Sequence, residues 1–72
     1  MTPDQNQQAI FAANLQRLRL QQSLTQKKLA AACFIAQPRV SDFERMNGDP
    51  KLSQITDLAK ALGVTVVDLL EN

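Results

Sequence analysis

Few residues in this chain carry groups that could do covalent chemistry, and their spacing excludes most catalysis. The sequence contains one cysteine and neither histidine nor tyrosine, so it holds no Ser/His/Asp set and no Cys/His pair. Gly48 and Gly63 stand apart from one another, which excludes a glycine-rich loop around a phosphate. The seven acidic residues show no repeated metal-ligand spacing. The sequence therefore predicts a protein that is not an enzyme and that uses no metal and no cofactor.

The charged side chains point instead to binding. The net charge is only +1, but residues 16–45 carry six basic and two acidic side chains, and the flanking segments are both acidic. A basic segment can attract a polyanion even when the whole chain is close to neutral. On charge alone, the alternative is a plain solvated face. The basic residues of this segment are Arg17, Arg19, Lys27, Lys28, Arg39 and Arg45.

The composition is rich in Ala, Leu and Gln, with few β-branched runs, and such a composition favours helices. We therefore expect helices to position the basic segment. The pattern predicts one all-α domain over residues 1–72, with helices at about 3–22, 26–33, 37–46, 52–62 and 65–70. A chain of 72 residues with a single cysteine must be stabilised by helix packing, by oligomerisation or by both. The side chains expected inside are Phe11, Leu15, Leu18, Leu29, Ala30, Cys33, Val40, Phe43, Leu52, Ile55, Leu58, Ala59 and Leu62.

Local signals predict several helix ends. The expected N-caps are Thr2, Thr25 and Thr65, and Gly63 is the expected stop of the fourth helix. A residue before proline is disfavoured in the α region. Gln37 is therefore expected to be the N-cap of the third helix or to lie just outside it.

Nothing in the sequence predicts a membrane or secreted protein. The longest apolar run, Leu29 to Ala36, is eight residues, whereas a membrane span needs about 20. The first residues lack the basic start of a signal peptide. A single unpaired cysteine fits a reducing compartment, where Cys33 is expected to be a small core residue rather than a redox sensor. We therefore expect a soluble, cytoplasmic protein.

One stretch carries a family resemblance. LTQKKLAAACFIAQPRVSDFER, followed by LAKALGVTVVDLL, resembles the helix-turn-helix family of phage repressors and Cro-type regulators over roughly residues 11–71. The shared parts are Thr25-Gln26, Leu29-Ala30, Ile35, Val40-Ser41, Phe43-Glu44-Arg45 and the segment 58–64. The resemblance implies a five-helix lambda-repressor-like domain from a bacterium or phage, with the helix-turn-helix at about 26–45. It also implies sequence-specific binding of double-stranded DNA, with the third helix in the major groove.

The resemblance and the helical periodicity together nominate residues that read bases. With Val40 and Phe43 turned inward, Pro38, Asp42 and Arg45 lie on the opposite face, and Ser41 lies beside them. The family's base-reading positions match Gln37, Pro38, Ser41 and Asp42. Gln37 can pair with adenine and Asp42 can accept from cytosine, whereas Pro38 offers only apolar contact. Arg39 is expected to read guanine or to bind phosphate, and the sequence leaves both open.

Other residues are expected to bind phosphates or to brace the motif. The phosphate candidates are Thr25, Gln26, Lys27, Arg45, Asn47 and Lys51, and in the family the residue matching Gln26 also bonds the start of the recognition helix, here Gln37. The family commonly pairs an arginine and a glutamate at the positions of Arg19 and Glu44, which implies a structural ion pair. Three residues depart from the pattern. Phe34 and Met46 stand where the family usually has glycine, and Pro38 is uncommon in the family's recognition helix.

Small modules of this kind bind pseudo-palindromic operators as dimers. The surplus of apolar residues near the end of the chain makes Val66, Val67 and Leu70 the candidates for a homodimer contact. We expect a transcriptional regulator, most simply a repressor. Alternatives with the same fold are the antitoxin of a toxin–antitoxin pair, which binds a toxin protein, and a restriction–modification controller. The alternative of another class is a helical protein-interaction domain that does not bind DNA.

Overall fold

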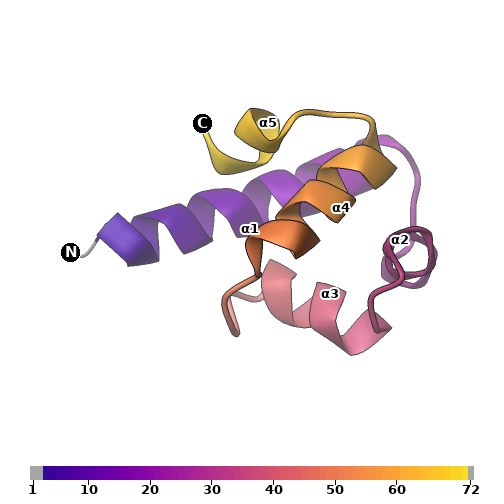
Figure 1. Cartoon of the computed structure of the whole chain (residues 1–72), viewed down its shortest axis with the longest axis horizontal. Coiled ribbons are helices and arrows are strands. Elements are labelled where there is room, and N and C mark those ends of the chain that lie inside the picture. The colour runs from indigo at the N-terminus through magenta and orange to yellow at the C-terminus, as the bar shows by residue number, and fades with distance from the viewer. Residues whose placement is uncertain (1–2, 72) are drawn as a thin grey trace.

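Five helices, the first of them much the longest, make up the fold. The computed structural model describes residues 3–71, with side chains from Gln7 onward. Its helices are α1 (Pro3–Gln21), α2 (Gln26–Cys33), α3 (Gln37–Glu44), α4 (Leu52–Leu62) and α5 (Val66–Leu70). α1 packs against α3 and α5, and α2 packs against α3 and α4 (Figure 1). The described residues form no strand, which confirms the prediction of an all-α, five-helix fold.

The core follows the predicted inward faces. Twelve buried apolar residues from all five helices form one cluster, and Phe43, Leu15, Leu29, Leu58, Leu69 and Val40 are its largest fully buried side chains. Each large side chain of this kind contributes about 1.5–3 kcal/mol on burial. One expectation was wrong, because Leu52 is 72% exposed. Leu52 is the first residue of α4, and at this position the side chain lies beyond the cluster rather than inside it.

The predicted caps of the inner helices are present. The Thr25 hydroxyl accepts from the Lys28 amide at 3.0 Å at the start of α2, and Thr65 forms a capping box with Asp68 at the start of α5. Gly63 ends α4 with a left-handed φ of 70°. The cap expected from Thr2 lies outside the described residues.

The start of α3 differs from the prediction. Ala36 is the N-cap, with extended backbone angles, and Gln37 is the first helical residue. The Arg39 amide bonds the Ala36 carbonyl at 2.9 Å and closes the first turn. Because Pro38 lies in this first turn, its missing N–H costs the helix no hydrogen bond. The closed turn outweighs the bias against a helical residue before proline.

Side chains of α1 hold the end of α5, which sequence reasoning did not anticipate. The buried Asn14 amide donates to the Leu69 carbonyl at 3.0 Å and to the Glu71 carbonyl at 2.8 Å. The Gln7 amide donates to the Leu70 carbonyl at 2.6 Å. The last carbonyls of a helix have no partner within the helix, so these contacts satisfy groups that would otherwise need water. They fasten the five-residue α5 to α1.

A three-residue turn, Phe34 to Ala36, connects α2 to α3. Phe34 is the C-cap of α2 and has left-handed angles, φ 57° and ψ 37°. The Ile35 amide bonds the Ala30 carbonyl at 3.0 Å, as in a common helix-ending motif. The left-handed region disfavours side chains with a β-carbon by about 1–2 kcal/mol. The chain therefore makes the glycine-type turn of the family with a phenylalanine.

Replacing Phe34 with glycine tests this strain. We expect Phe34→Gly to be about 1 kcal/mol more stable to urea than Phe34→Ala, because only glycine adopts the left-handed turn freely. Both variants lose the phenyl ring, so the comparison isolates the backbone term. Equal unfolding midpoints for the two variants would contradict a strained turn.

Candidate nucleic-acid interface

α2 and α3 form a rigid helix–turn–helix. Ala30 is buried on the inner face of α2, and Leu29, Val40 and Phe43 belong to the same buried cluster. Ile35, from the turn, is half-buried against the same cluster. These side chains fix the angle between α2 and α3, which decides what the outer face of α3 can reach.

The outer face of α3 presents polar groups close together. Gln37 and Pro38 are exposed in the first turn, and Ser41 and Asp42 are half-buried one turn later. The Asp42 carboxylate accepts from Arg45 Nη2 at 3.0 Å in a largely exposed i,i+3 pair. Such pairs contribute at most about 1 kcal/mol, so both side chains can exchange this contact for another partner.

Arg39 does not extend from α3 like its neighbours. Its guanidinium carbon lies 5.0 Å from the centre of the Phe43 ring, and that ring packs edge-to-face on Phe11 with centroids 6.1 Å apart. A β-carbon added to Gly48 would lie 3.9 Å from Arg39 Nη1. The guanidinium is therefore stacked on the core aromatic pair and directed toward the loop between α3 and α4.

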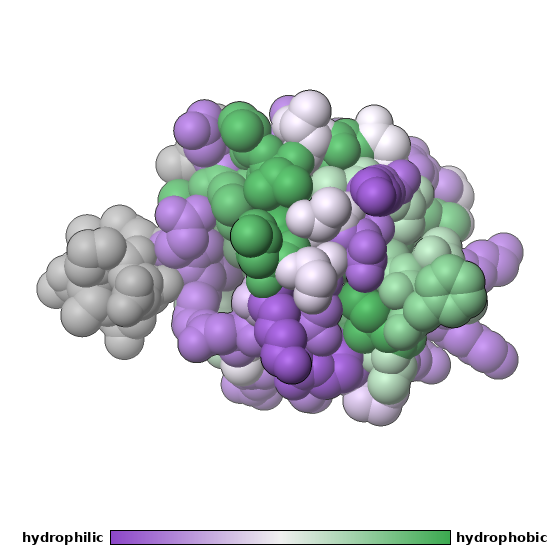
Figure 2. Space-filling view, viewed as in Figure 1, coloured by the Kyte–Doolittle hydropathy of each residue, from purple (hydrophilic) through white to green (hydrophobic). Residues whose placement is uncertain are grey.

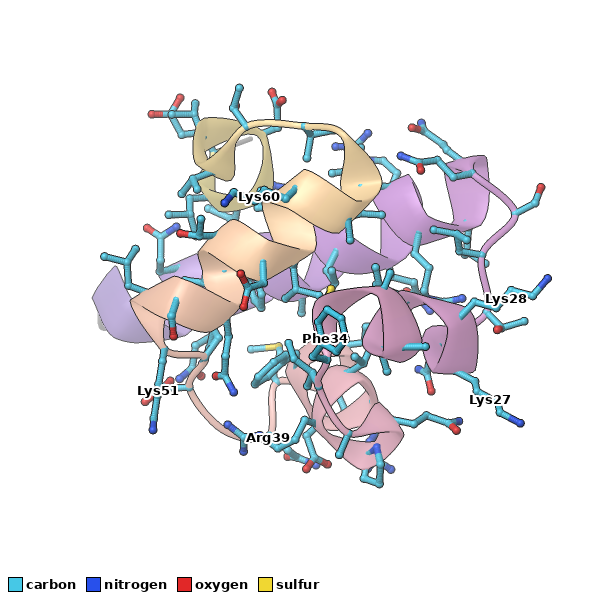
Figure 3. All side chains as sticks on the ribbon, turned by 45° about the vertical axis from the view of Figure 1, so that its right-hand side comes forward. Lys27, Lys28, Phe34, Arg39, Lys51 and Lys60 are labelled. Atoms are coloured by element: carbon cyan, nitrogen blue, oxygen red, sulfur yellow. The ribbon has the colours of Figure 1, made fainter. Side chains whose placement is uncertain are left out.

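Cations lie on both sides of α3. Lys27 and Lys28 extend from α2 on one side, and Arg39 and Lys51 lie on the other (Figure 3). Two further phosphate candidates lie close in sequence to these residues. Thr25 is exposed at the start of α2, and Asn47 is exposed in the loop after α3. Hydrophilic atoms gather at the lower left and lower centre of the molecule in Figure 2. The surface around α3 is thus polar, with positive groups on two flanks.

A buried ion pair joins the first and third helices. Arg19 Nε lies 2.6 Å from Glu44 Oε2, and Arg19 Nη2 donates to Glu44 Oε1 at 3.0 Å. Arg19 Nη1 also donates to the Leu24 carbonyl at 2.8 Å. The two side chains are 10% and 3% exposed. The hydrogen bond to Glu44 raises the pKa of Arg19 despite the opposing effect of burial, so the guanidinium stays charged.

Gln26 bonds this ion pair rather than Gln37. Its amide Nε2 donates to Glu44 Oε1 at 3.1 Å, and no hydrogen bond joins Gln26 to Gln37 among the residues that the structure describes. A buried carboxylate is a stronger acceptor than a neutral amide, which explains the difference from the family pattern. Glu44 consequently connects α1, α2 and α3.

The residues expected at a dimer contact differ in exposure. Val66 and Leu70 are half-buried against the core, whereas Val67 is 56% exposed. Figure 2 shows apolar atoms gathered over α5 and the adjoining part of α4. Cys33 is buried in α2, as expected, and its thiol lies 3.6 Å from the Asp57 carbonyl. Burial raises the pKa of this thiol, and the negative charge of Asp57 raises it further.

Within the described part of the chain, no three potential ligands gather at a metal site and no helix is long and apolar enough to cross a membrane.

A sequence model of the family described as helix-turn-helix matches residues 15–69, which is most of the chain. The chain belongs to the helix-turn-helix family. Family members are DNA-binding transcriptional regulators, which are not enzymes.

Three relatives illustrate what this helix-turn-helix protein is similar to. The transcriptional regulator DdrOP3 of Deinococcus deserti is 42% identical over 57 residues, which are 79% of this chain but only 44% of that protein. The control protein C.BamHI of Bacillus amyloliquefaciens is 36% identical over 67 residues, covering 92% of this chain and 83% of that one. The solved restriction–modification controller C.AhdI of Aeromonas hydrophila superposes with a TM-score of 0.84 at 29% identity, covering 86% of this chain and 94% of that one.

The buried ion pair gives a stability prediction for this helix-turn-helix protein. We expect Glu44→Ala to lower the free energy of unfolding by about 3–5 kcal/mol, because it leaves the Arg19 guanidinium buried without its partner. The double variant Arg19→Leu with Glu44→Leu should recover part of that loss, since no unpaired charge remains. Urea unfolding followed by circular dichroism measures each value.

The exposed pair on the same helix supplies the control. Asp42→Ala breaks the contact with Arg45 and should change stability by less than about 1 kcal/mol. If Glu44→Ala and Asp42→Ala cost the same, Glu44 would not be the structural junction described above.

Proposed function

We propose that this protein is a cytoplasmic, dimeric transcriptional regulator, most simply a repressor, that reads an operator through the major groove with α3. The observation that carries the proposal is the division of α3 into two faces. Val40, Phe43 and Glu44 fix its inner face to the core, while Gln37, Ser41 and Asp42 lie together on the outer face. A rigid helix with such a face suits a groove whose base edges carry donors and acceptors.

The dimensions and chemistry of α3 support direct readout. An α-helix with its side chains is about 10–12 Å in diameter, and the major groove is about 12 Å wide. The Gln37 amide can bond both the N6 and N7 positions of adenine, and the Asp42 carboxylate can accept from cytosine N4. Ser41 can bond either kind of base, and Pro38 offers apolar contact to a thymine methyl.

The flanking polar groups fit the two phosphate backbones that border a groove. On one side, Thr25, Gln26 and Lys27 open α2, where free backbone amides favour an anion. On the other side lies Lys51. Arg45 at the end of α3 and Asn47 in the loop after it are further candidates. Contacts of this kind set orientation and affinity but carry no sequence information.

Arg39 belongs with the phosphate contacts rather than with the base readers. Its stacking on Phe43 directs the guanidinium along α3 toward Gly48 and away from the outer face that carries Ser41 and Asp42. Reaching guanine would require the side chain to leave the ring and give up a cation–π contact. The stacking therefore supports phosphate binding over guanine reading, the two roles that the sequence alone leaves open for Arg39.

Two copies are needed for tight and specific binding, since one small module makes few base contacts. The exposed Val67, beside the half-buried Val66 and Leu70, offers an apolar surface on α5 for a homodimer. A two-fold dimer places two α3 helices in half-sites about one DNA turn apart. The partner on DNA is then an inverted repeat.

Selection from random double-stranded DNA tests the whole proposal. We expect an inverted-repeat motif that loses preference at defined bases with Gln37→Ala and at other bases with Asp42→Ala, because each side chain reads its own positions. Gln16→Ala, an exposed amide on α1, is the matched control and should select the wild-type motif. Binding without any motif at physiological salt would reduce the interaction to phosphate attraction and contradict the proposal.

Arg39→Gln separates phosphate binding from base reading. We expect it to weaken binding to all sequences by a similar factor and to reduce the slope of log affinity against log salt by about 1. The selected motif should stay unchanged. Relaxed preference at one base pair, with an unchanged salt slope, would show instead that Arg39 reads guanine.

A restriction–modification controller is the second candidate, because C.BamHI and C.AhdI match this chain over nearly their whole lengths whereas DdrOP3 is much longer. The same α3 contacts would then regulate the genes of a restriction endonuclease and its methyltransferase. A restriction gene beside the gene for this chain distinguishes this role from general repression.

A further inference from the structure

The side chain of Phe34 contributes nothing to the packing of a single copy. It is 98% exposed and stands in a left-handed turn that favours glycine. It is not one of the residues that the proposed function uses. An aromatic ring held in solvent at a strained position is a feature of the surface that the monomer does not explain.

A hollow lies directly beside this ring. It has a volume of about 530 Å³ and lies between the α2–α3 turn and α4. Ala32, Cys33, Ile35 and Ala61 provide its apolar lining, and Phe34 stands at its edge. A second group of apolar atoms lies at the right of the molecule in Figure 2, apart from the group over α5. A protruding aromatic group and a recess that can receive one are thus adjacent on the same surface.

The charges at the edge of the hollow are arranged in a self-complementary way. Asp57 and Lys60 line it from α4, and both are exposed. They carry opposite charges three residues apart, and neither forms an ion pair with another residue in the described part of the chain. In a two-fold contact, residue i meets residue j and j meets i. Asp57 of each copy would therefore face Lys60 of the other.

We propose that this surface binds a second copy of the chain, with Phe34 of each copy seated in the hollow of the other and the Asp57–Lys60 pairs closing the edge. The contact lies at the α2–α3 turn, whereas the proposed dimer contact lies on α5 (Figure 1). One chain can therefore use both surfaces at once. On the basis of the proposed function, the Phe34 contact joins neighbouring dimers on adjacent operators and makes their binding cooperative.

Sedimentation equilibrium of the full chain tests the contact directly. We expect wild-type protein at high concentration to have at least twice the mass of Phe34→Ser under the same conditions, because each α5 dimer carries two Phe34 surfaces and can bind a further dimer through either one. Leu20→Ser, which removes another exposed apolar side chain from α1, is the matched control and should keep the wild-type mass. Equal masses for wild type and Phe34→Ser would overturn the proposal, and so would an equal loss with Leu20→Ser.

Charge reversal tests the geometry of the contact. Asp57→Lys and Lys60→Asp should each weaken the association by about tenfold or more, because like charges then meet across the two-fold axis. The double variant, with Asp57→Lys and Lys60→Asp together, restores the opposite-charge pairs and should recover most of the affinity. If the double variant associates no better than the single ones, the two-fold arrangement is wrong.

DNA binding separates this proposal from the proposed function. Phe34→Ser should bind one inverted repeat as tightly as wild type but should lose cooperative filling of two adjacent repeats. If no DNA is bound by either protein, the proposed function fails while the mass difference still establishes the contact. If two repeats fill independently with wild-type protein, the role in cooperativity is overturned.

Discussion

Three helices meet at the carboxylate of Glu44, and the position of α3 depends on this junction. Two bonds from Arg19 and one from Gln26 converge on the same two oxygens. A buried charge is tolerated only when its hydrogen bonds are satisfied. In the described part of the chain, no buried side-chain nitrogen or oxygen lacks a partner. These bonds fix the end of α3 relative to α1 and to the start of α2. Apolar packing is not directional and would not by itself define this geometry.

The core that surrounds this junction is small, which makes local strain matter. Ser23, Phe34 and Met46 all have left-handed backbone angles without being glycine. Each such residue costs about 1–2 kcal/mol, and a domain of this size has only a few kcal/mol to spare. Hydrogen bonds from buried polar side chains therefore supplement the packing of the apolar cluster. Asn14 holds α5 to α1 in the same way that Glu44 holds α3.

Most of the fold could be predicted from the sequence because its signals are local. Helical periodicity gave the buried faces, and Thr25, Gly63 and Thr65 marked helix ends through contacts within a few residues. One error was local, because the first turn of α3 closes on Ala36 and makes Gln37 helical. The other arose where distant parts of the chain decide. The exposure of Leu52 depends on where the core ends rather than on its place in the pattern.

The candidate site also combines features that local sequence patterns predict with contacts between distant residues that they do not predict. Periodicity placed Gln37, Ser41 and Asp42 on one face, but no sequence pattern showed that Arg39 stacks on Phe43 or that Gln26 bonds Glu44. Those outcomes depend on ring positions and on which acceptor is stronger. Asn14 looked like any polar residue of α1, and only its distance to the last turn of the chain shows what it does.

The separation of the two faces of α3 also bears on how such proteins diverge. Val40, Phe43 and Glu44 carry the packing, and none of them lies on the outer face. Substitutions at Gln37, Pro38, Ser41 and Asp42 therefore leave the buried contacts intact. Under the proposed function, a lineage can therefore change its DNA specificity through these few positions without losing the fold. The buried residues that hold α3 in place are then retained, while the residues on its outer face change.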